Sequence, residues 1–416
     1  MIRLIYFLSK NYSFRVIKRI TPFNTVFPKN LIIKIILKFF RFIIYIFVFL
    51  FFKIFKLKTL NSPLEALGHQ CWDLECIFID ENFTCKDKRI LIPYHENYFA
   101  NKYLFDNFQI LRMKKKLKFK LVHSRFFCLI LFLLRPYKSL SLDTKFYISN
   151  KYVTGFKLIK DQFKYYIPKD ELYNKGIEIL KRNKIKLDKK FVLIHARDSS
   201  YKPFDNETYR NTDINTFSLL VNYLLEKNFI VVRSGNFGMK KSFFDNNIID
   251  LTNKKLLKGD KKILDVFLSA YCEFMVGTCS GFNSLSALFG KKILSVNMVP
   301  YSHSLCIDPG LSLPKLYRYK NSKKFLSFKE IVSLNYDVFK VDELFKKNNI
   351  ELIDNTENEI LDAFKDLENF DFKNKIEDNL QKKYRNNFLL NGQARYCYES
   401  VTSVAPSFIK KYSNLL

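Results

Sequence analysis

The sequence lacks the motifs that mark several common enzyme classes. It has five histidines, and it contains neither the HExxH pattern of metalloproteases, nor the GxxxxGK(S/T) loop of P-loop NTPases, nor the GxGxxG turn of dinucleotide dehydrogenases. Its eight cysteines form no CxxC pair and have no neighbouring histidine at zinc-finger spacing. These absences remove the main support for those classes, and they predict that the cysteines are reduced core thiols in a cytosolic protein.

Acidic residues are also scarce, with 40 aspartates and glutamates against 70 lysines and arginines and a net charge of +30. A surface this basic needs an anionic partner, and nucleic acid, an anionic membrane face and phosphorylated substrates all qualify. Heavy use of Lys, Asn, Ile and Phe also fits an AT-rich genome, which supplies part of the excess without any function. The basic residues are spread along the whole chain, and no helix-turn-helix, zinc or RNA-binding signature appears, so nucleic acid is not the expected partner.

Length and composition predict a globular protein of several domains, because the chain has 416 residues and is 48% hydrophobic. We expect a membrane-associating segment over 1–60, an N-terminal α/β domain over 61–185, a C-terminal Rossmann-like domain over 186–340 and a helical tail over 341–416. In the tail, Thr356 and Glu359 have the Thr-x-x-Glu spacing of a capping box that opens a helix.

An apolar stretch near the amino terminus, Leu31–Lys58, resembles a membrane segment until its charges are placed. Its uncharged core, Phe42–Phe52, has 11 residues, whereas a bilayer-spanning helix needs about 20. Lys34, Lys38 and Arg41 share one helical face, which favours a helix that lies in the membrane interface with these cations at the headgroups. No small-residue cleavage site follows, so a secretory signal peptide is not expected. The pattern predicts a peripheral or monotopic protein at the cytoplasmic face of the inner membrane.

A second apolar patch, Arg125–Arg135, places nine apolar residues between two arginines. Nine residues cannot span a bilayer, so the pattern favours a buried helix of the first domain. If the patch is exposed, it gives the protein a second membrane contact that basic charge strengthens on anionic lipid.

Strands and helices alternate along the chain in the manner of a parallel sheet. In the first domain we expect a strand over 89–95 and a helix over 101–116. From 191 on the alternation is regular, with strands expected over 191–195, 229–233, 247–251, 273–278 and 291–297, and helices over about 213–227, 261–271 and 281–290. This predicts a Rossmann-like sheet with right-handed crossovers.

Charged and small residues gather where these predicted strands end. In open α/β sheets ligands bind beyond the carboxyl ends of the strands, so we expect a site there. Ser280 and Gly281 begin a helix, whose first backbone N–H groups favour an anion, and the guanidinium groups of Arg197 and Arg233 can grip phosphate. The candidate site residues are His195, Arg197, Asp198, Arg210, Asp213, Arg233, Gly235, Thr278, Ser280 and Gly281. For Asp213, or for Thr212 beside it, a helix cap is an equally good reading.

The ordered set "FVLIHARDSSY", "YRNTDINTF", "VVRSG" and "LDVFLSAYCEFMVGTCSGFNSLSALFG" resembles a bacterial family of glycosyltransferases. It is more remotely similar to the fucosyltransferases that share an HxR-type motif in a GT-B fold. The similarity runs from about 190 to 300. It implies two Rossmann-like domains, with a nucleotide-sugar donor on the carboxyl-terminal half and a glycan or lipid-linked acceptor on the other.

The resemblance also implies roles for individual residues. Arg197 would bind the β-phosphate of the donor and Ser280 would also contact phosphate. Apart from the resemblance, Asp198, which directly follows Arg197, is the second catalytic candidate. The stretch 65–75 would form the acceptor-side loop, which contains the Gly-His pair Gly68 and His69.

An inverting transfer needs a base that takes the proton of the acceptor hydroxyl. The candidates are His69, Asp73, His95 and Glu96, and the sequence does not rank them. No Asp-x-Asp pair occurs in the chain, so we expect a metal-independent reaction without a cofactor, in which Arg197 and a helix N-terminus hold the diphosphate. A basic nucleic-acid-binding protein and a catalytically inactive glycan-binding relative are the alternatives.

Overall fold

The computed structural model describes residues 46–60, 62, 64–79, 89–134, 141–142, 163–200, 207–244, 247–305, 310–370, 378–390 and 394–416. The chain forms two compact units, Met1–Phe146 and Tyr147–Leu416. Both are α/β units built on a parallel sheet, which confirms the predicted fold class. The predicted membrane segment Leu31–Lys58 lies within the described residues only from 46 onward.

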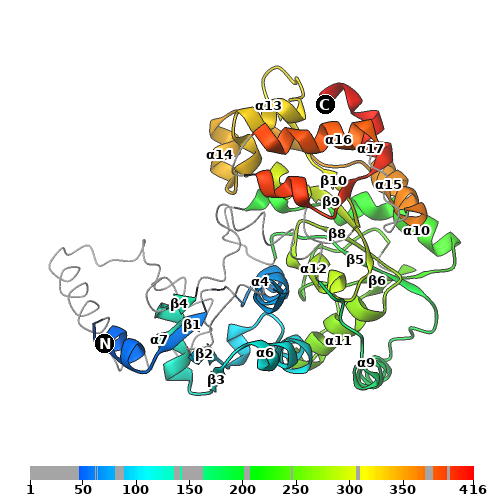
Figure 1. Ribbon diagram of the computed structural model, residues 1–416. Coiled ribbons are helices and arrows are strands. Elements are labelled where there is room, and N and C mark those ends of the chain that lie inside the picture. Colours follow the sequence, from blue (N-terminus) through cyan, green and yellow to red (C-terminus); the bar gives the residue numbers. More distant parts are fainter. Residues whose placement is uncertain are drawn as a thin grey trace, which may run out of the picture. The chain divides into compact units, whose positions relative to one another are not determined.

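The first unit contains a four-stranded parallel sheet in the order β3-β2-β1-β4. Its strands are β1 (Leu57–Leu60), β2 (Arg89–Pro93), β3 (Phe119–Val122) and β4 (Ser141–Leu142). The chain runs from β1 through β2 to β3 in one direction and then crosses back to β4 on the other side of β1 (Figure 1). Such a reversal is a topological switch point, and it lies at β1.

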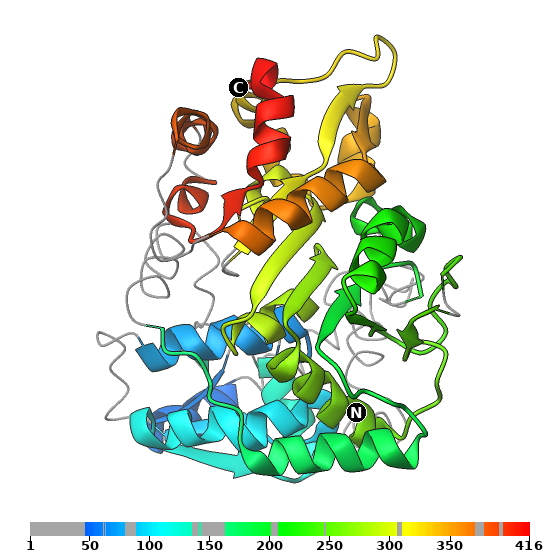
Figure 2. The ribbon, with the colours of Figure 1, turned by 90° about the vertical axis from the view of Figure 1, so that its right-hand side faces the viewer.

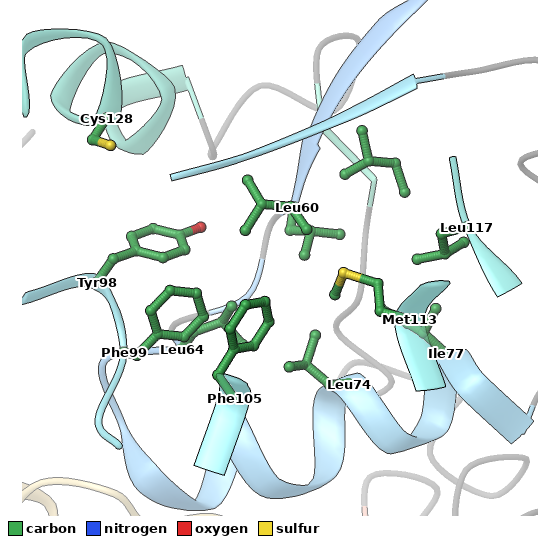
Figure 3. Packing of buried hydrophobic residues seen from close by; sticks show 12 residues of the cluster. Leu60, Leu64, Leu74, Ile77, Tyr98, Phe99, Phe105, Met113, Leu117 and Cys128 are labelled. Carbon is green, nitrogen blue, oxygen red and sulfur yellow. The ribbon is translucent and has the colours of Figure 1, made fainter. Parts of the chain in front are cut away.

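Helices connect these strands and close the core of the first unit. Helix α4 (Leu67–Ile79) joins β1 to β2, α7 (Arg125–Leu134) joins β3 to β4, and η1 (Glu96–Tyr98) follows β2. The helix predicted over 101–116 is present, with one π-helical turn in it: α5 (Lys102–Leu104), η2 (Phe105–Gln109) and α6 (Ile110–Lys116). Figure 3 shows Leu74 of α4 directed into the buried cluster that contains Phe105 and Met113.

The second unit contains a seven-stranded, fully parallel sheet in the order β13-β10-β9-β8-β5-β6-β7. Its strands are β5 (Phe191–His195), β6 (Ile230–Arg233), β7 (Ile249–Asp250), β8 (Phe274–Thr278), β9 (Lys292–Met298), β10 (Gly310–Pro314) and β13 (Ser403–Val404). All five strands predicted between 191 and 297 are present, because each is a short apolar run that the sheet buries.

Two groups of helices pack on this sheet. Helices α10 (Ser218–Glu226), α15 (Glu357–Asn369) and α17 (Pro406–Lys411) form one contiguous group, and α9 (Asp170–Arg182), α11 (Lys258–Tyr271) and α12 (Gly281–Ala287) form the other. The crossover through α10 runs from β5 to β6, and the crossover through α12 runs from β8 to β9 in the opposite direction. Right-handed crossovers in opposite directions place these helices on opposite faces of the sheet. Figure 2 shows α15, in orange, along the upper part of this sheet.

The predicted domain boundaries differ from the division in the structure. Helix α9 precedes the expected boundary at 185, yet it packs on α11 of the second unit, where the position of a Cβ on Gly176 is 2.2 Å from the Phe267 ring. The part after 341 is not a separate helical tail. It supplies β13 to the large sheet, and β12 (Ile350–Ile353) pairs with β11 (Leu316–Tyr319). Local sequence patterns predict individual helices and strands, but they do not predict which sheet a strand late in the chain will join.

Smaller sequence predictions have clear outcomes. Thr356 and Glu359 form the predicted capping box at the start of α15. Among the described residues, six cysteines are free and buried, as expected for reduced core thiols, and Cys85 and Cys306 lie outside that part of the chain. Helix α7 is present, with Cys128 and Leu131 buried and Phe127 57% exposed, so the described side chains of the patch Arg125–Arg135 are buried only in part.

A glycine pair tests the packing of the second unit. At Gly310, where β10 starts beside β9, a Cβ would lie 2.0 Å from the backbone oxygen of Ile293, whereas at Gly259 in the first turn of α11 nothing lies within 4 Å. Because backbone cannot move aside cheaply, we expect Gly310→Ala to destabilise the unit by about 1–3 kcal/mol. Gly259→Ala should be neutral or stabilising, by up to about 1 kcal/mol. Melting temperatures of the two variants measure this difference, and equal values would contradict the strand packing.

Candidate functional site

The switch point of the second unit lies between β5 and β8. From β5 the chain continues to β6 on one side, and from β8 it continues to β9 on the other, so the two connections diverge and leave a crevice at the carboxyl ends of these neighbouring strands. Arg197 lies two residues beyond the end of β5, and Cys279 directly follows β8. A hydrogen bond from the Arg197 backbone N–H to Thr278 Oγ1, 2.9 Å long, ties the two strand ends together.

The Arg197 side chain turns toward the segment that contains η3 (Thr208–Arg210). Its Nη1 donates to the Glu207 carbonyl at 2.6 Å and to Asn211 Oδ1 at 3.3 Å, and its side chain is 6% exposed. The Thr212 N–H donates back to the Arg197 carbonyl at 3.0 Å. Arg197 thus fixes the segment 207–212 against the end of β5, and its predicted contact with a leaving phosphate stays a prediction.

Arg210 is the more accessible cation at this edge. Its Nε and Nη2 donate to the Cys279 carbonyl at 3.1 and 2.7 Å, and its Nη1 donates to Glu207 Oε2 at 2.8 Å. A quarter of its side chain is exposed. The Arg210 guanidinium is therefore anchored between the exits of β5 and β8, in the place where an anionic ligand of this sheet would bind.

A third cation, Lys340, comes from far along the chain. Partial burial of its ammonium group lowers the pKa of Lys340, and the positive charge of Arg210 acts in the same direction. Arg197, Arg210 and Lys340 share Glu207 as a nearby carboxylate. This part of the carboxyl edge therefore carries excess positive charge that a bound phosphate would neutralise.

The turn into α12 has the predicted form. Ser280 is the N-cap, and its Oγ accepts a hydrogen bond of 3.1 Å from the Phe282 N–H, while Gly281 is the first residue of the helix. The Ser280 hydroxyl is thus already used by the helix, and its predicted contact with phosphate is not tested by this geometry.

His195, the last residue of β5, is buried beside the same edge. Its Nδ1 lies 2.8 Å from the Ser234 carbonyl oxygen, and its ring stacks on Phe282 with centroids 5.1 Å apart. Burial lowers the pKa of His195 to about 4, because the hydrogen bond to Ser234 does not offset the loss of solvation. Gly235 directly follows Ser234, and a Cβ at this position would lie 2.2 Å from Met239 Sδ. The hydrogen bond and ring contact of His195, and the lack of space for a side chain at Gly235, are therefore explained by packing within the unit.

Three predicted site residues lie in structural contacts. Arg233 is 1% exposed, and its Nη1 is 3.1 Å from Asp250 Oδ2, so it is an interior ion pair. Asp198 accepts hydrogen bonds from Ser200 and from the Lys240 N–H. Asp213 caps the short helix η4 (Ile214–Phe217), which is the alternative that the sequence left open.

The acceptor-side candidates all lie in the first unit. The prediction of a loop over 65–75 is wrong, because helix α4 begins at Leu67 and includes Gly68 and His69 in its first turn. The apolar residues Leu67, Cys71 and Leu74 have the i, i+4, i+7 spacing of a helix, and the Gly-His pair obscured that signal. His95 and Glu96 lie at the start of η1.

Sequence analysis missed two residues of the site. Glu207 contacts both Arg197 and Arg210, and Lys340 approaches Arg210 from a segment more than a hundred residues away. The i, i+3 spacing of Glu207 and Arg210 is a local signal for the ion pair between these two residues. Nothing in the sequence around Lys340 indicates its partner. Across the described ranges, no group of three His, Cys, Asp or Glu residues is arranged to hold a metal ion.

Comparisons with known proteins give distant likenesses. No protein-family model matches the sequence, and no curated protein matches it. Among solved structures, the E. coli ADP-heptose LPS heptosyltransferase II is similar over 59% of this chain and 86% of its own, at 11% identity and a TM-score of 0.37. A family 9 glycosyl transferase from Veillonella parvula is similar over 75% of this chain and 96% of its own, at 12% identity and a TM-score of 0.39.

A third structure, the iron-containing heptosyltransferase TibC in complex with ADP-D-beta-D-heptose, is similar over 58% of this chain and 57% of its own, at 11% identity and a TM-score of 0.31. Likenesses at these identities and scores do not assign an activity to this chain. The similarity to fucosyltransferases stays a prediction.

The buried histidine makes stability depend on pH. The pKa of His195 is about 4 in the folded protein, below the ordinary 6.5, so the unfolded chain binds a proton more readily. The free energy of unfolding does not depend on this group well above pH 6.5. It decreases as the pH falls from 6.5 toward 4, and at pH 5 the decrease is about 2 kcal/mol. We expect His195→Gln to remove this part of the acid sensitivity, measured as the melting temperature between pH 7 and pH 5. His123→Gln, at an exposed position, is the matched control. An unchanged pH profile in His195→Gln would contradict the buried neutral state.

Proposed function

We propose that the protein is a glycosyltransferase that moves a sugar from a nucleotide-diphosphate sugar to a glycan or lipid-linked acceptor in the synthesis of surface polysaccharide or another glycan. The observation that carries the proposal is Arg210, a partly exposed guanidinium anchored on the Cys279 carbonyl at the switch point of a seven-stranded parallel sheet. Ligands of such sheets bind at this place, and a diphosphate is the ligand that a guanidinium there favours. The sequence resemblance to glycosyltransferases supports the same reading.

The charge of the site suits departure of a nucleoside diphosphate. As the bond from the anomeric carbon to the β-phosphate oxygen breaks, negative charge builds up on that oxygen. Arg210 and Lys340 supply positive charge beside it, and Glu207 and Arg197 keep Arg210 in place. Fixed cations can stabilise this charge without a divalent ion, so the proposed reaction is metal-independent, and direct attack by the acceptor makes it inverting.

We also propose that the protein lies on an anionic membrane surface, at the cytoplasmic face of the inner membrane, through the helix at 46–54. This helix packs through Phe52 on Leu131 of α7, while its other side exposes Phe47, Phe51 and Ile54. Lys53 and Lys56 beside them are exposed as well. No described helix is long and apolar enough to cross a membrane. An exposed aromatic face flanked by lysines is suited to the headgroup region of anionic lipid.

Removal of the anchored guanidinium tests the donor site. We expect Arg210→Gln to weaken binding of the preferred nucleoside diphosphate by about 10- to 100-fold, because one charge-assisted contact contributes about 1.5–3 kcal/mol. The measurement is the thermal shift of purified protein with UDP, GDP, CDP and ADP, with and without EDTA. Arg182→Gln is the matched control, since Arg182 pairs with Asp260 on α11 and has an exposed side chain.

The outcomes of that screen separate the functions. A selective shift that EDTA leaves unchanged, present in the wild type and lost in Arg210→Gln, supports the metal-independent transferase. No shift with any nucleotide, together with salt-dependent retention on DNA, favours the nucleic-acid alternative. Binding of a nucleotide sugar without turnover on any acceptor favours the inactive relative.

Two substitutions test the membrane surface. Phe51→Ser combined with Ile54→Ser should reduce binding to phosphatidylglycerol vesicles several-fold or more, because both side chains are exposed and each loses its contact with the acyl chains. Vesicle co-sedimentation measures the effect, and Phe243→Ser, which removes an exposed aromatic of the second unit, is the control. Equal sedimentation of the double variant and the control would contradict the proposed surface.

A further inference from the structure

Between β10 and α15 the chain leaves the large sheet and forms a separate segment over 315–354. The strands β11 and β12 pair within this segment, and helix α14 (Asp342–Lys347) precedes β12 (Figure 1). At its two ends, Lys315 and Asp354 form an ion pair of 2.7 Å, and the Lys315 ammonium also donates to the Asn211 carbonyl at 3.0 Å. The ends of the 315–354 segment are therefore attached to the residue that follows Arg210.

A second attachment joins α14 to η3. Asp342 Oδ2 accepts hydrogen bonds from the Thr208 N–H at 2.9 Å and from the Thr208 hydroxyl at 2.8 Å, and its Oδ1 accepts from the Tyr209 N–H at 2.7 Å. These N–H groups lie in the first turn of η3, where the helix itself supplies no acceptor. The Tyr209 ring also packs on Phe345 of α14, with centroids 5.4 Å apart. Helix α14 is therefore fixed to the residues that directly precede Arg210.

This attachment brings Lys340, two residues before Asp342, into electrostatic range of Arg210. The Lys340 side chain is exposed, yet the protein around its ammonium group lowers the pKa of Lys340, and the charge of Arg210 acts in the same direction. Among the described residues, no acceptor forms a hydrogen bond or an ion pair with Lys340. Lys315, in the same segment, has both kinds of partner. An ammonium group that is held beside a guanidinium without an acceptor of its own is suited to an anionic ligand.

We propose that Lys340 is a phosphate-binding residue of the donor site and that Asp342 is its positioning residue; this rests on the proposed function. The diphosphate is then bound by two cations from distant parts of the chain. The Cys279 carbonyl holds the guanidinium of Arg210, and the bonds of Asp342 to η3 hold the backbone that carries Lys340. The phosphate oxygens supply the acceptor that Lys340 lacks among the described residues. Because electrostatic attraction increases with the charge of the ligand, Lys340 favours a nucleoside diphosphate over the monophosphate.

Calorimetric titration of full-length protein tests the role of Lys340. The probe is whichever of UDP, GDP, CDP and ADP binds the wild type most tightly, together with the monophosphate of the same nucleoside. We expect Lys340→Gln to weaken diphosphate binding by about 10-fold or more, and monophosphate binding by less, because one charge-assisted contact is lost. Lys340→Arg keeps the charge and should bind the diphosphate within about threefold of the wild type.

The control for Lys340 is Lys346→Gln, which removes an exposed lysine of α14 and should keep the wild-type affinity. The melting temperature of ligand-free Lys340→Gln should equal that of the wild type, since no described hydrogen bond of Lys340 is lost.

The role of Asp342 has its own test. We expect Asp342→Asn to weaken diphosphate binding by about threefold to tenfold, because an amide cannot accept all three hydrogen bonds from η3. The effect should be smaller in a Lys340→Gln background, since both substitutions then act on the same contact. Glu343→Gln, at the exposed next residue, is the matched control and should bind as the wild type does.

The outcomes separate this inference from the proposed function. Wild-type affinity in Lys340→Gln, or an equal loss in Lys340→Gln and Lys340→Arg, would overturn the phosphate contact. Full additivity of Asp342→Asn and Lys340→Gln would overturn the positioning role of Asp342. If the wild type binds none of the four diphosphates, the proposed function fails as well, so binding by the wild type distinguishes the two failures.

Discussion

The burial of β5 constrains the rest of the second unit. All five residues of this strand are buried in the middle of a seven-stranded sheet whose faces both carry helices. A charge on such a strand would lose its hydration without gaining a partner, so the first place for charged side chains is beyond the strand's end. His195 is the transition point, since it is still inside and burial keeps its pKa near 4. Arg197, two residues on, is the first permanently charged group, and the Glu207 carbonyl and Asn211 Oδ1 accept its hydrogen bonds.

Several cations lie close together at this edge because their charges have different partners. Arg233 and Asp250 form a buried pair, and Lys315 is paired with Asp354 at 2.7 Å, so these charges are neutralised inside the unit. Arg210 differs, because two of its nitrogens bind a neutral carbonyl oxygen and its charge is offset by Glu207, which Arg197 shares. The carboxyl edge therefore keeps positive charge at the surface while the interior beneath it is balanced.

The sequence predicted what depends on neighbouring residues and missed what depends on distant ones. Short apolar runs located the parallel strands, and the Thr-x-x-Glu spacing located the start of α15. Arg233 looked like a ligand at a strand end, but its partner Asp250 is on β7, which pairs with β6 only in the folded sheet. Lys340 reaches the site through tertiary packing for the same reason. A residue's position after a strand is readable from the sequence, whereas the direction of its side chain depends on which charges the fold brings near.

Helix α4 shows how packing alone can fix the geometry of a polar group. It buries Gln70, Asp73 and Glu75, an expensive set for one helix unless every member has a partner on another element. Asn101 and Gln109 hold Gln70, Ser62 holds Asp73, and Arg112 donates to Glu75. A rotation of the helix would break all of these contacts and also withdraw Leu74 from the apolar cluster. Only one orientation satisfies both requirements, and that orientation places the His69 ring at the sheet edge with a buried carboxylate behind it.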